Sequence, residues 1–372
     1  MTDRRHTTAL LRAHEDANEL ALRSPERKAR AFNVAIGDPQ ASLSQFLRVL
    51  DLHGLLDDDG RIRPEVGLVS MGDHFDFGRP EQRAEATNDG LCILSWLAAH
   101  PPDQVQIIVG NHDLVRVGEL ASFTDESYAE AQALADQALQ NPSKVAAFTA
   151  RYPMLASPAV IARDYSCFSV RQRELVARLL KRKRLRLAVA AANDLLLVHA
   201  GITADDLGLL ESLPAWDAPT IAAALNQFLD DRVARWKGEG PLDLAPLHEL
   251  GSARDGEAKG ILAHRPANPA VRKPDRAQRT YDPNSLPRNL VQIIGHINDK
   301  KCRELMGDWA EKKAPEPGVL RGLKIGYQVS YHTGCDDDDR LVFLDGGMNQ
   351  VAPFEYEIYD LELRQRMIRK SG

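Results

Sequence analysis

The chain has 372 residues, 44% of them apolar, and a formal net charge of −6, a composition that provides for a large hydrophobic core. The negative charge does not favour nucleic acid as the main partner, and no run approaches the roughly 18 consecutive apolar residues of a membrane-spanning helix. Residues 1–30 are polar and charged and lack the apolar segment of a secretory signal. The four cysteines lie far apart without a CxxC pair, which is typical of reduced thiols. We therefore expect a cytoplasmic protein that does not associate with membranes.

Short apolar runs predict buried strands, and helical patterns separate the first of them. The runs occupy residues 32–36, 66–71, 106–109, 195–198 and 290–294. After the first run, apolar residues from Leu43 to Leu50 repeat at the spacing of a surface helix, and residues 81–100 predict a second helix. This alternation predicts β-α-β units with parallel strands and right-handed crossovers.

The remaining segments predict an extension and two insertions. Residues 1–30 predict a helical N-terminal extension with a modest apolar stripe. The segment of about 114–184 is longer than a crossover requires and predicts a helical insertion, and a second insertion of about 217–289 begins as a helix and continues as an ordered polar loop. A strand is expected at 324–331. We interpret residues 31–365 as one domain that carries both insertions.

Polar residues follow these strands in a recurring position. They are Gly37-Asp38-Pro39-Gln40, Gly72-Asp73-His74-Phe75-Asp76, Gly110-Asn111-His112-Asp113, and the single histidines His199 and His296. Aspartate, asparagine and histidine carried just past several strand ends are what a two-metal hydrolase needs. Because the set offers oxygen and imidazole ligands but no thiolate, it suits manganese, iron or zinc better than calcium or magnesium. We therefore expect two divalent metal ions, with manganese as the preferred metal and iron or zinc as the alternatives.

The same residues predict a reaction. A carboxylate shared by two metals holds them roughly 3.5–4 Å apart, so that a metal-bound hydroxide attacks phosphorus in line. Asp73 is the natural bridge, because its string lies between the other groups of ligands. His112 would protonate the leaving oxygen, oriented by a carboxylate such as Asp76. His74 is expected to be structural.

At this point the strings resemble those of the calcineurin-like metallophosphoesterase superfamily. The spacing is most similar to its phosphoprotein-phosphatase branch, which also includes bacterial diadenosine tetraphosphate hydrolases. The string Leu344-Asp345-Gly346-Gly347-Met348 resembles a late Asp-Thr-Gly turn of that branch. The resemblance runs from about residue 32 to residue 348 and covers the motifs, not the insertions.

The resemblance implies a fold and a role for each motif residue. The implied fold is α/β, a four-layer α/β/β/α sandwich of two mixed sheets flanked by helices, here with a helical insertion, and residues 31–365 would be the catalytic domain. Asp38 and Gln40 would bind one metal and Asp73 would bridge the two. The implied ligands of the other metal are Asn111, His199 and His296. The general acid would be His112, with Asp76 as its partner.

The chain departs from the family pattern at two positions. Gln40 replaces the usual ligand histidine, and an amide oxygen is a neutral, weaker donor. Phe77 stands where the phosphatase branch has an arginine that clamps phosphate, and that interaction is strong. Arg79 or Arg265 would substitute for it in binding substrate.

The main hypothesis is a two-metal phosphoester hydrolase that acts as a phosphomonoesterase of the Ser/Thr-phosphatase type. Its partner would be a phosphorylated small molecule, a nucleotide or a phosphoprotein. One alternative within this class is a dinucleoside polyphosphate hydrolase or a phosphodiesterase. The alternative from another class is a catalytically decayed, phosphate-binding regulatory protein, marked by Gln40 and Phe77. The basic run 181–184 is explained by the end of a helix rather than by nucleic-acid contact.

Overall fold

The structure is a computed structural model that describes residues 2–19, 32–210, 213–271 and 279–362. Helix α1 (Thr2–Glu19) forms the described part of the predicted N-terminal extension, and residues 20–30 lie outside the described ranges. Within these ranges, no helix is both long and apolar enough to cross a membrane.

The first sheet carries the N-terminal strands of the domain. Its strand order is β15 (Tyr359–Asp360), β1 (Val34–Ile36), β2 (Leu68–Ser70), β3 (Val105–Ile108) and β4 (Leu185–Arg186). Strands β1 to β4 are parallel, as the β-α-β pattern predicts, and β15 adds an antiparallel edge. The carboxyl ends of β1, β2 and β3 therefore open on the same side of the sheet.

The second sheet is also mixed. Its strand order is β13 (Val329–Thr333), β12 (Arg321–Ile325), β14 (Asp339–Phe343), β11 (Val291–Ile294), β6 (Leu195–Val198) and β5 (Ala188–Ala192). Strands β14, β11 and β6 run parallel to one another, whereas β12, β13 and β5 pair antiparallel. The parallel centre of this sheet carries the last two predicted strands, which end at the predicted histidines.

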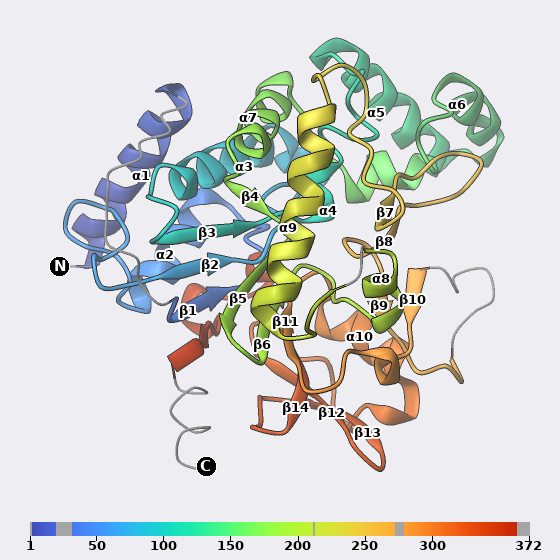
Figure 1. Cartoon of the computed structure of the whole chain (residues 1–372). Coiled ribbons are helices and arrows are strands. Elements are labelled where there is room, and N and C mark those ends of the chain that lie inside the picture. Colours follow the sequence, from blue (N-terminus) through green and yellow to red (C-terminus); the bar gives the residue numbers. More distant parts are fainter. Residues whose placement is uncertain (1, 20–31, 211–212, 272–278, 363–372) are drawn as a thin grey trace.

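The two sheets pack face to face. One buried cluster joins Val69 of β2 and Ile108 of β3 to Leu197 of β6 and Ile293 of β11. Neighbouring residues such as Ile36 and Ile294 point the other way and join the larger core under the helices, as the two-residue period of a strand requires. The predicted four-layer sandwich of two mixed sheets flanked by helices is confirmed (Figure 1).

Helices cover the outer faces. The helices packed in the core beside the first sheet are α1, α2 (Leu43–Leu52), α3 (Arg83–Ala98) and α7 (Val170–Lys181). Helix α9 (Ala218–Arg235) lies across β5 of the second sheet. Helix α10 (Asp299–Met306) follows β11, and the short helices α4 (Asn111–Leu114) and α8 (Ala204–Gly208) follow β3 and β6.

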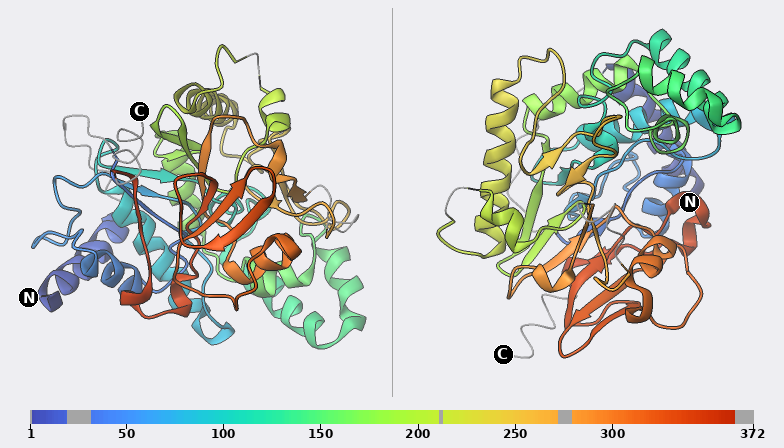
Figure 2. Two further views of the ribbon diagram at one scale, coloured as in Figure 1. Left: turned by 90° about the horizontal axis from the view of Figure 1, so that it is seen from below. Right: turned by 90° about the vertical axis from the view of Figure 1, so that its right-hand side faces the viewer.

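Between α4 and β4 the chain forms a further set of helices, of which the first two stand away from the two sheets. They are α5 (Asp125–Gln140), α6 (Val145–Arg151), a π-helical turn (Val160–Asp164) and α7. Figure 2 shows α5 and α6 at one edge of the molecule. This part of the chain has an apolar cluster of its own around Phe123, Tyr128 and Phe148. The later segment contains α9 and two small ribbons: β7 (His248–Glu249) with β8 (Lys259–Gly260), and β9 (Arg265–Pro266) with β10 (Thr280–Tyr281).

The prediction of one strand at 324–331 is wrong. The segment contains the end of β12, a turn and the start of β13, which pair as an antiparallel hairpin. Gly326 and exposed Tyr327 lie at the turn. The apolar residues on either side read as one run because the turn is very short.

Candidate metal centre

Five strand ends bring the predicted ligands toward one place. Asp38 follows β1, Asp73 follows β2 and Asn111 follows β3, while His199 and His296 follow β6 and β11 of the other sheet. Each strand is apolar and buried, so the first polar side chain after it lies at the edge shared by both sheets. The sequence places the ligands on separate strands, and the packing of the sheets brings them together.

Backbone geometry fixes these loops. Asp73, Asp76 and His296 adopt left-handed φ angles of 55°, 67° and 65°, which non-glycine residues rarely adopt. A Cβ atom at Gly110 would lie 2.0 Å from Oδ1 of Asp73, and one at Gly295 would lie 2.0 Å from Oδ1 of Asp38. Only glycine allows the neighbouring loops to approach these carboxylates so closely.

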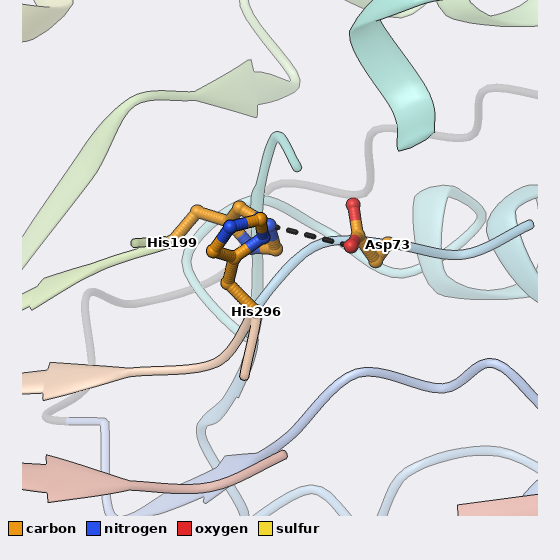
Figure 3. A group of neighbouring side chains, drawn as sticks. All are labelled: Asp73, His199 and His296. Atoms are coloured by element: carbon orange, nitrogen blue, oxygen red, sulfur yellow. Dashed lines mark ion pairs between the residues drawn. The ribbon is translucent and has the colours of Figure 1, made fainter. Parts of the chain in front are cut away.

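Asp73, His199 and His296 form the centre of the group. One ligand atom from each residue lies within 4.8 Å of the others, and Nε2 of His199 is 3.4 Å from Oδ2 of Asp73 (Figure 3). The Nδ1 atom of His199 donates to the carbonyl of Met71 at 2.8 Å, so Nε2 of the neutral ring presents a lone pair. The Nε2 atom of His296 donates to the carbonyl of Ala263 at 3.0 Å, which leaves Nδ1 for the site.

Three potential metal ligands converge at Nε2 of His199. Oδ1 of Asn111 lies 3.2 Å from Nε2 of His199, the same nitrogen that faces Asp73. Burial lowers the pKa of His199, but the charge of Asp73 outweighs burial and the net shift is upward, so a proton or a metal ion on Nε2 can hold the three together. A neutral imidazole, an amide oxygen and a carboxylate do not satisfy one another as acceptors. A divalent cation satisfies all of them, and this combination of donors fits manganese, iron or zinc.

Asp38 contributes a second, unbalanced carboxylate. Its Oδ2 accepts from the backbone N–H of His296 at 2.8 Å, whereas its buried Oδ1 has no hydrogen-bond partner among the described residues. Burial and the neighbouring charges of Asp345 and Asp73 raise the pKa of Asp38 well above its ordinary value. A buried carboxylate in this setting requires a counter-charge, so Asp38 also fits a cation site.

His112 and Asp76 form a hydrogen-bonded pair at the rim of the group. Nδ1 of His112 donates to Oδ2 of Asp76 at 2.9 Å, and Nε2 of His112 is 3.9 Å from Oδ2 of Asp73. Burial lowers the pKa of His112, but the charges of Asp73 and Asp76 outweigh burial and the net shift is upward. The ring is therefore held with Nε2 directed at the site and with a tendency to carry a proton.

Arg116 was not foreseen from the sequence. Its buried guanidinium donates to Oδ2 of Asp76 at 2.7 Å and to the carbonyl of Cys167 at 2.6 Å. Burial raises the pKa of Asp76, yet the charge of Arg116 and the hydrogen bond from His112 produce a net lowering. Arg116 thus keeps Asp76 ionised. In the sequence, the only indication of this role is that Arg116 stands four residues after His112, a spacing that places two side chains on the same face of a helix.

Asp113 was also missed, although it stands in the third string. Its carboxylate accepts from the backbone N–H groups of Gly110, Asp73 and His74 at 2.8–3.1 Å, and from the ring of His74. The other ring nitrogen of His74 is 2.9 Å from the hydroxyl of Ser70. Asp113 and His74 tie the loop after β2 to the loop after β3, and so His74 has the structural contacts expected of it.

Gln40 and the two predicted substrate-binding arginines lie farther out. Nε2 of Gln40 donates to the carbonyl of Phe75 at 3.0 Å, so its Oε1 is the atom available to a metal. Arg79 is exposed and lines a hollow beside the site. Arg265 lies near His296: burial lowers the pKa of His296, and the positive charge of Arg265 lowers it further.

A cavity of about 200 Å³ opens beside Asp38. Its lining includes Asp38, Gln40, Asp76, Phe77, Arg163 and Asp345. Asp38, Gln40 and Asp76 of the first two strings thus share one concave surface with the late Asp345 turn, whereas Asp73 does not line it.

No family model and no curated protein matches the chain. Among solved structures, the chain is similar to a protein serine/threonine phosphatase from Saccharomyces cerevisiae that is described as similar to human phosphatase PP5. The two share 12% identity over 93% of this chain and 77% of that one, with a TM-score of 0.39. In its motif residues the chain resembles the calcineurin-like metallophosphoesterases.

Proposed function

We propose that the protein is a metal-dependent phosphoester hydrolase. The convergence of potential metal ligands from Asp73, Asn111 and His199 at the ends of buried strands supports this assignment. Two divalent ions bound there would activate water and neutralise the charge of a phosphoryl group.

The ligand residues divide between two positions in this proposal. Asp38 and Gln40 would hold one ion, and Asp73 would be shared between the two. The residues assigned to the other ion are Asn111, His199 and His296. The unpaired Oδ1 of Asp38 and the free Oε1 of Gln40 support the first position.

His112 would be the general acid. Asp76 holds its Nδ1 proton, so Nε2 is the atom that delivers a proton to the leaving oxygen. Arg116 keeps Asp76 ionised and thereby favours the protonated ring before the reaction. Asp76 is buried, whereas His112 is half-buried, so its ring remains within reach of a bound substrate.

The first test measures Mn²⁺-dependent hydrolysis of para-nitrophenyl phosphate and of its bis-ester, with the metal content of each preparation. We expect monoester turnover in the wild type and its loss, with loss of bound metal, in Asp73→Asn. If the wild type instead hydrolyses the bis-ester faster than the monoester, the protein is a phosphodiesterase. A metal-bound wild type that hydrolyses neither ester, nor a panel of dinucleoside polyphosphates, would contradict the proposal and favour a binding protein. Full activity in Asp73→Asn would contradict the ligand assignment.

A further inference from the structure

One segment of the helical insertion, residues 160–167, packs against the His112–Asp76 pair. The π-helical turn Val160–Asp164 leads into residues 165–167, and such turns are often found at functional sites. The ring of Tyr165 packs edge-on against His112, with 5.1 Å between centroids, and the N–H of Cys167 donates to Oδ1 of Asp76 at 2.8 Å. Phe77 packs against Cys167 in a small buried cluster. The segment is thus fixed against the general-acid pair.

Arg163 stands at the mouth of the cavity beside the metal centre. The carboxylates of Asp38, Asp76 and Asp345 line this cavity, and Arg163 supplies the only cationic side chain among the described lining residues. Phe77, which also lines it, is apolar. When the carboxylates bind divalent ions, Arg163 would therefore be the positively charged side chain of this cavity that faces a bound anion.

The guanidinium of Arg163 is available. Arg83 forms two hydrogen bonds with Asp136, and Arg116 is committed to Asp76. Within the described part of the chain, by contrast, Arg163 is exposed and has no hydrogen bond or ion pair. All five of its N–H donors can therefore turn to a ligand.

Arg163 is better placed than Arg79 for this role. A second hollow of about 680 Å³ adjoins the first and shares Gly78, Arg163 and Ser166 with it. Arg79 lines only this second hollow, whereas Arg163 borders both. A phosphoryl group in the smaller cavity would meet Arg163, and the rest of the substrate would extend past it.

We propose that Arg163 binds the peripheral oxygens of the substrate's phosphoryl group and selects terminal phosphate monoesters. This inference rests on the proposed function and specifies its substrate class. A guanidinium binds two phosphate oxygens side by side. A monoester offers three peripheral oxygens, enough for metal ions and Arg163 together, whereas a diester offers only two. The insertion, rather than the strand-end loops, supplies this contact.

The test measures binding of inorganic phosphate to the Mn²⁺-loaded protein by calorimetry. Arg163→Ala should raise the dissociation constant for phosphate about tenfold or more, and Arg163→Lys should recover part of the loss. Arg151→Ala is the matched control, because Arg151 lies on the same insertion, is 59% exposed, and contacts exposed Glu130 and the ring of Tyr152 rather than the cavity. In turnover, Arg163→Ala should lower kcat/KM for the monoester more than for the bis-ester.

The outcomes separate this inference from the proposed function. Phosphate affinity within about twofold of wild type in Arg163→Ala, with Mn²⁺ still bound, would overturn the role of Arg163 alone. A loss in Arg79→Ala instead would move that role to Arg79. A wild type that binds no Mn²⁺ would overturn the metal centre itself. Arg163 is exposed, so thermal unfolding of Arg163→Ala should match that of wild type and verify folding.

Discussion

Oδ1 of Asp38, a buried carboxylate oxygen with no donor among the described residues, marks the candidate site at the scale of single residues. Burying Asp38 next to Asp73 and Asp345 costs free energy, because like charges in a low-dielectric site repel one another. The structural Asp113 beside the same site is satisfied differently, because its carboxylate accepts several backbone N–H groups. The contrast separates a residue that holds the loops from one that we propose as a metal ligand.

His112 provides the sharpest test among single residues. We expect His112→Ala to lower kcat by about 10²-fold or more for alkyl phosphates, whose leaving oxygen needs a proton, following the usual size of general-acid effects. The loss for para-nitrophenyl phosphate should be much smaller, since that leaving group departs as a stable anion. Parallel assays of the two esters measure this difference.

Metal analysis is the control for that experiment. His112→Ala should retain the wild-type metal content, because the ring is bonded to Asp76 and lies outside the group formed by Asp73, His199 and His296. An equal loss on both esters would contradict a general-acid role and indicate a role in metal or substrate binding. Unchanged rates on both would contradict any catalytic role.

At the scale of elements, short motifs on strand ends were predictable and contacts made by the insertion were not. Apolar runs locate strands, and a polar residue just past each run marks the loop; these are local signals. Arg163 and Tyr165 come from a segment whose pattern is merely that of a helix end. Tyr165 reaches His112 and Arg163 reaches the cavity only because of how the insertion folds back, which no local pattern encodes.

The two insertions also contact each other through Glu119. This buried carboxyl accepts the N–H of Gly251 at 2.8 Å and lines a small cavity with Asp164 and Glu257. Burial raises the pKa of Glu119 to about 7 from 4.5. The folded protein therefore keeps a proton on Glu119 at pH values where the unfolded chain has lost it.

This raised pKa predicts a pH-dependent stability. The stabilisation from protonated Glu119 is complete below pH 4.5 and is lost as the pH rises through about 7. Glu119→Gln keeps the acceptor but cannot ionise, so its stability relative to wild type should increase between pH 5 and 7. The increase should approach about 1.4 kcal/mol per pH unit. Urea unfolding of both proteins at several pH values measures it, and a constant difference would show that Glu119 ionises normally.

At the scale of the whole molecule, the site lies where two independently hydrogen-bonded sheets meet. Asp38, Asp73 and Asn111 belong to the first sheet, and His199 and His296 belong to the second. Between the sheets lies a dry apolar layer that has no directional preference. Metal ions would add directional bonds across that layer, so that ligand binding and folding become linked.

That linkage predicts a metal-dependent thermal stability. A ligand at 100 times its dissociation constant stabilises the native state by about 2.7 kcal/mol, which corresponds to a rise of a few degrees in Tm for a chain of this length. We therefore expect Mn²⁺ to raise the Tm of the wild type and chelator to reverse the change. Asp73→Asn should show no rise, because Asp73 faces ligands from both sheets. In Arg163→Ala the rise should persist, because Arg163 would contact substrate and not metal. An equal rise in Asp73→Asn would place the stabilising ion elsewhere in the molecule.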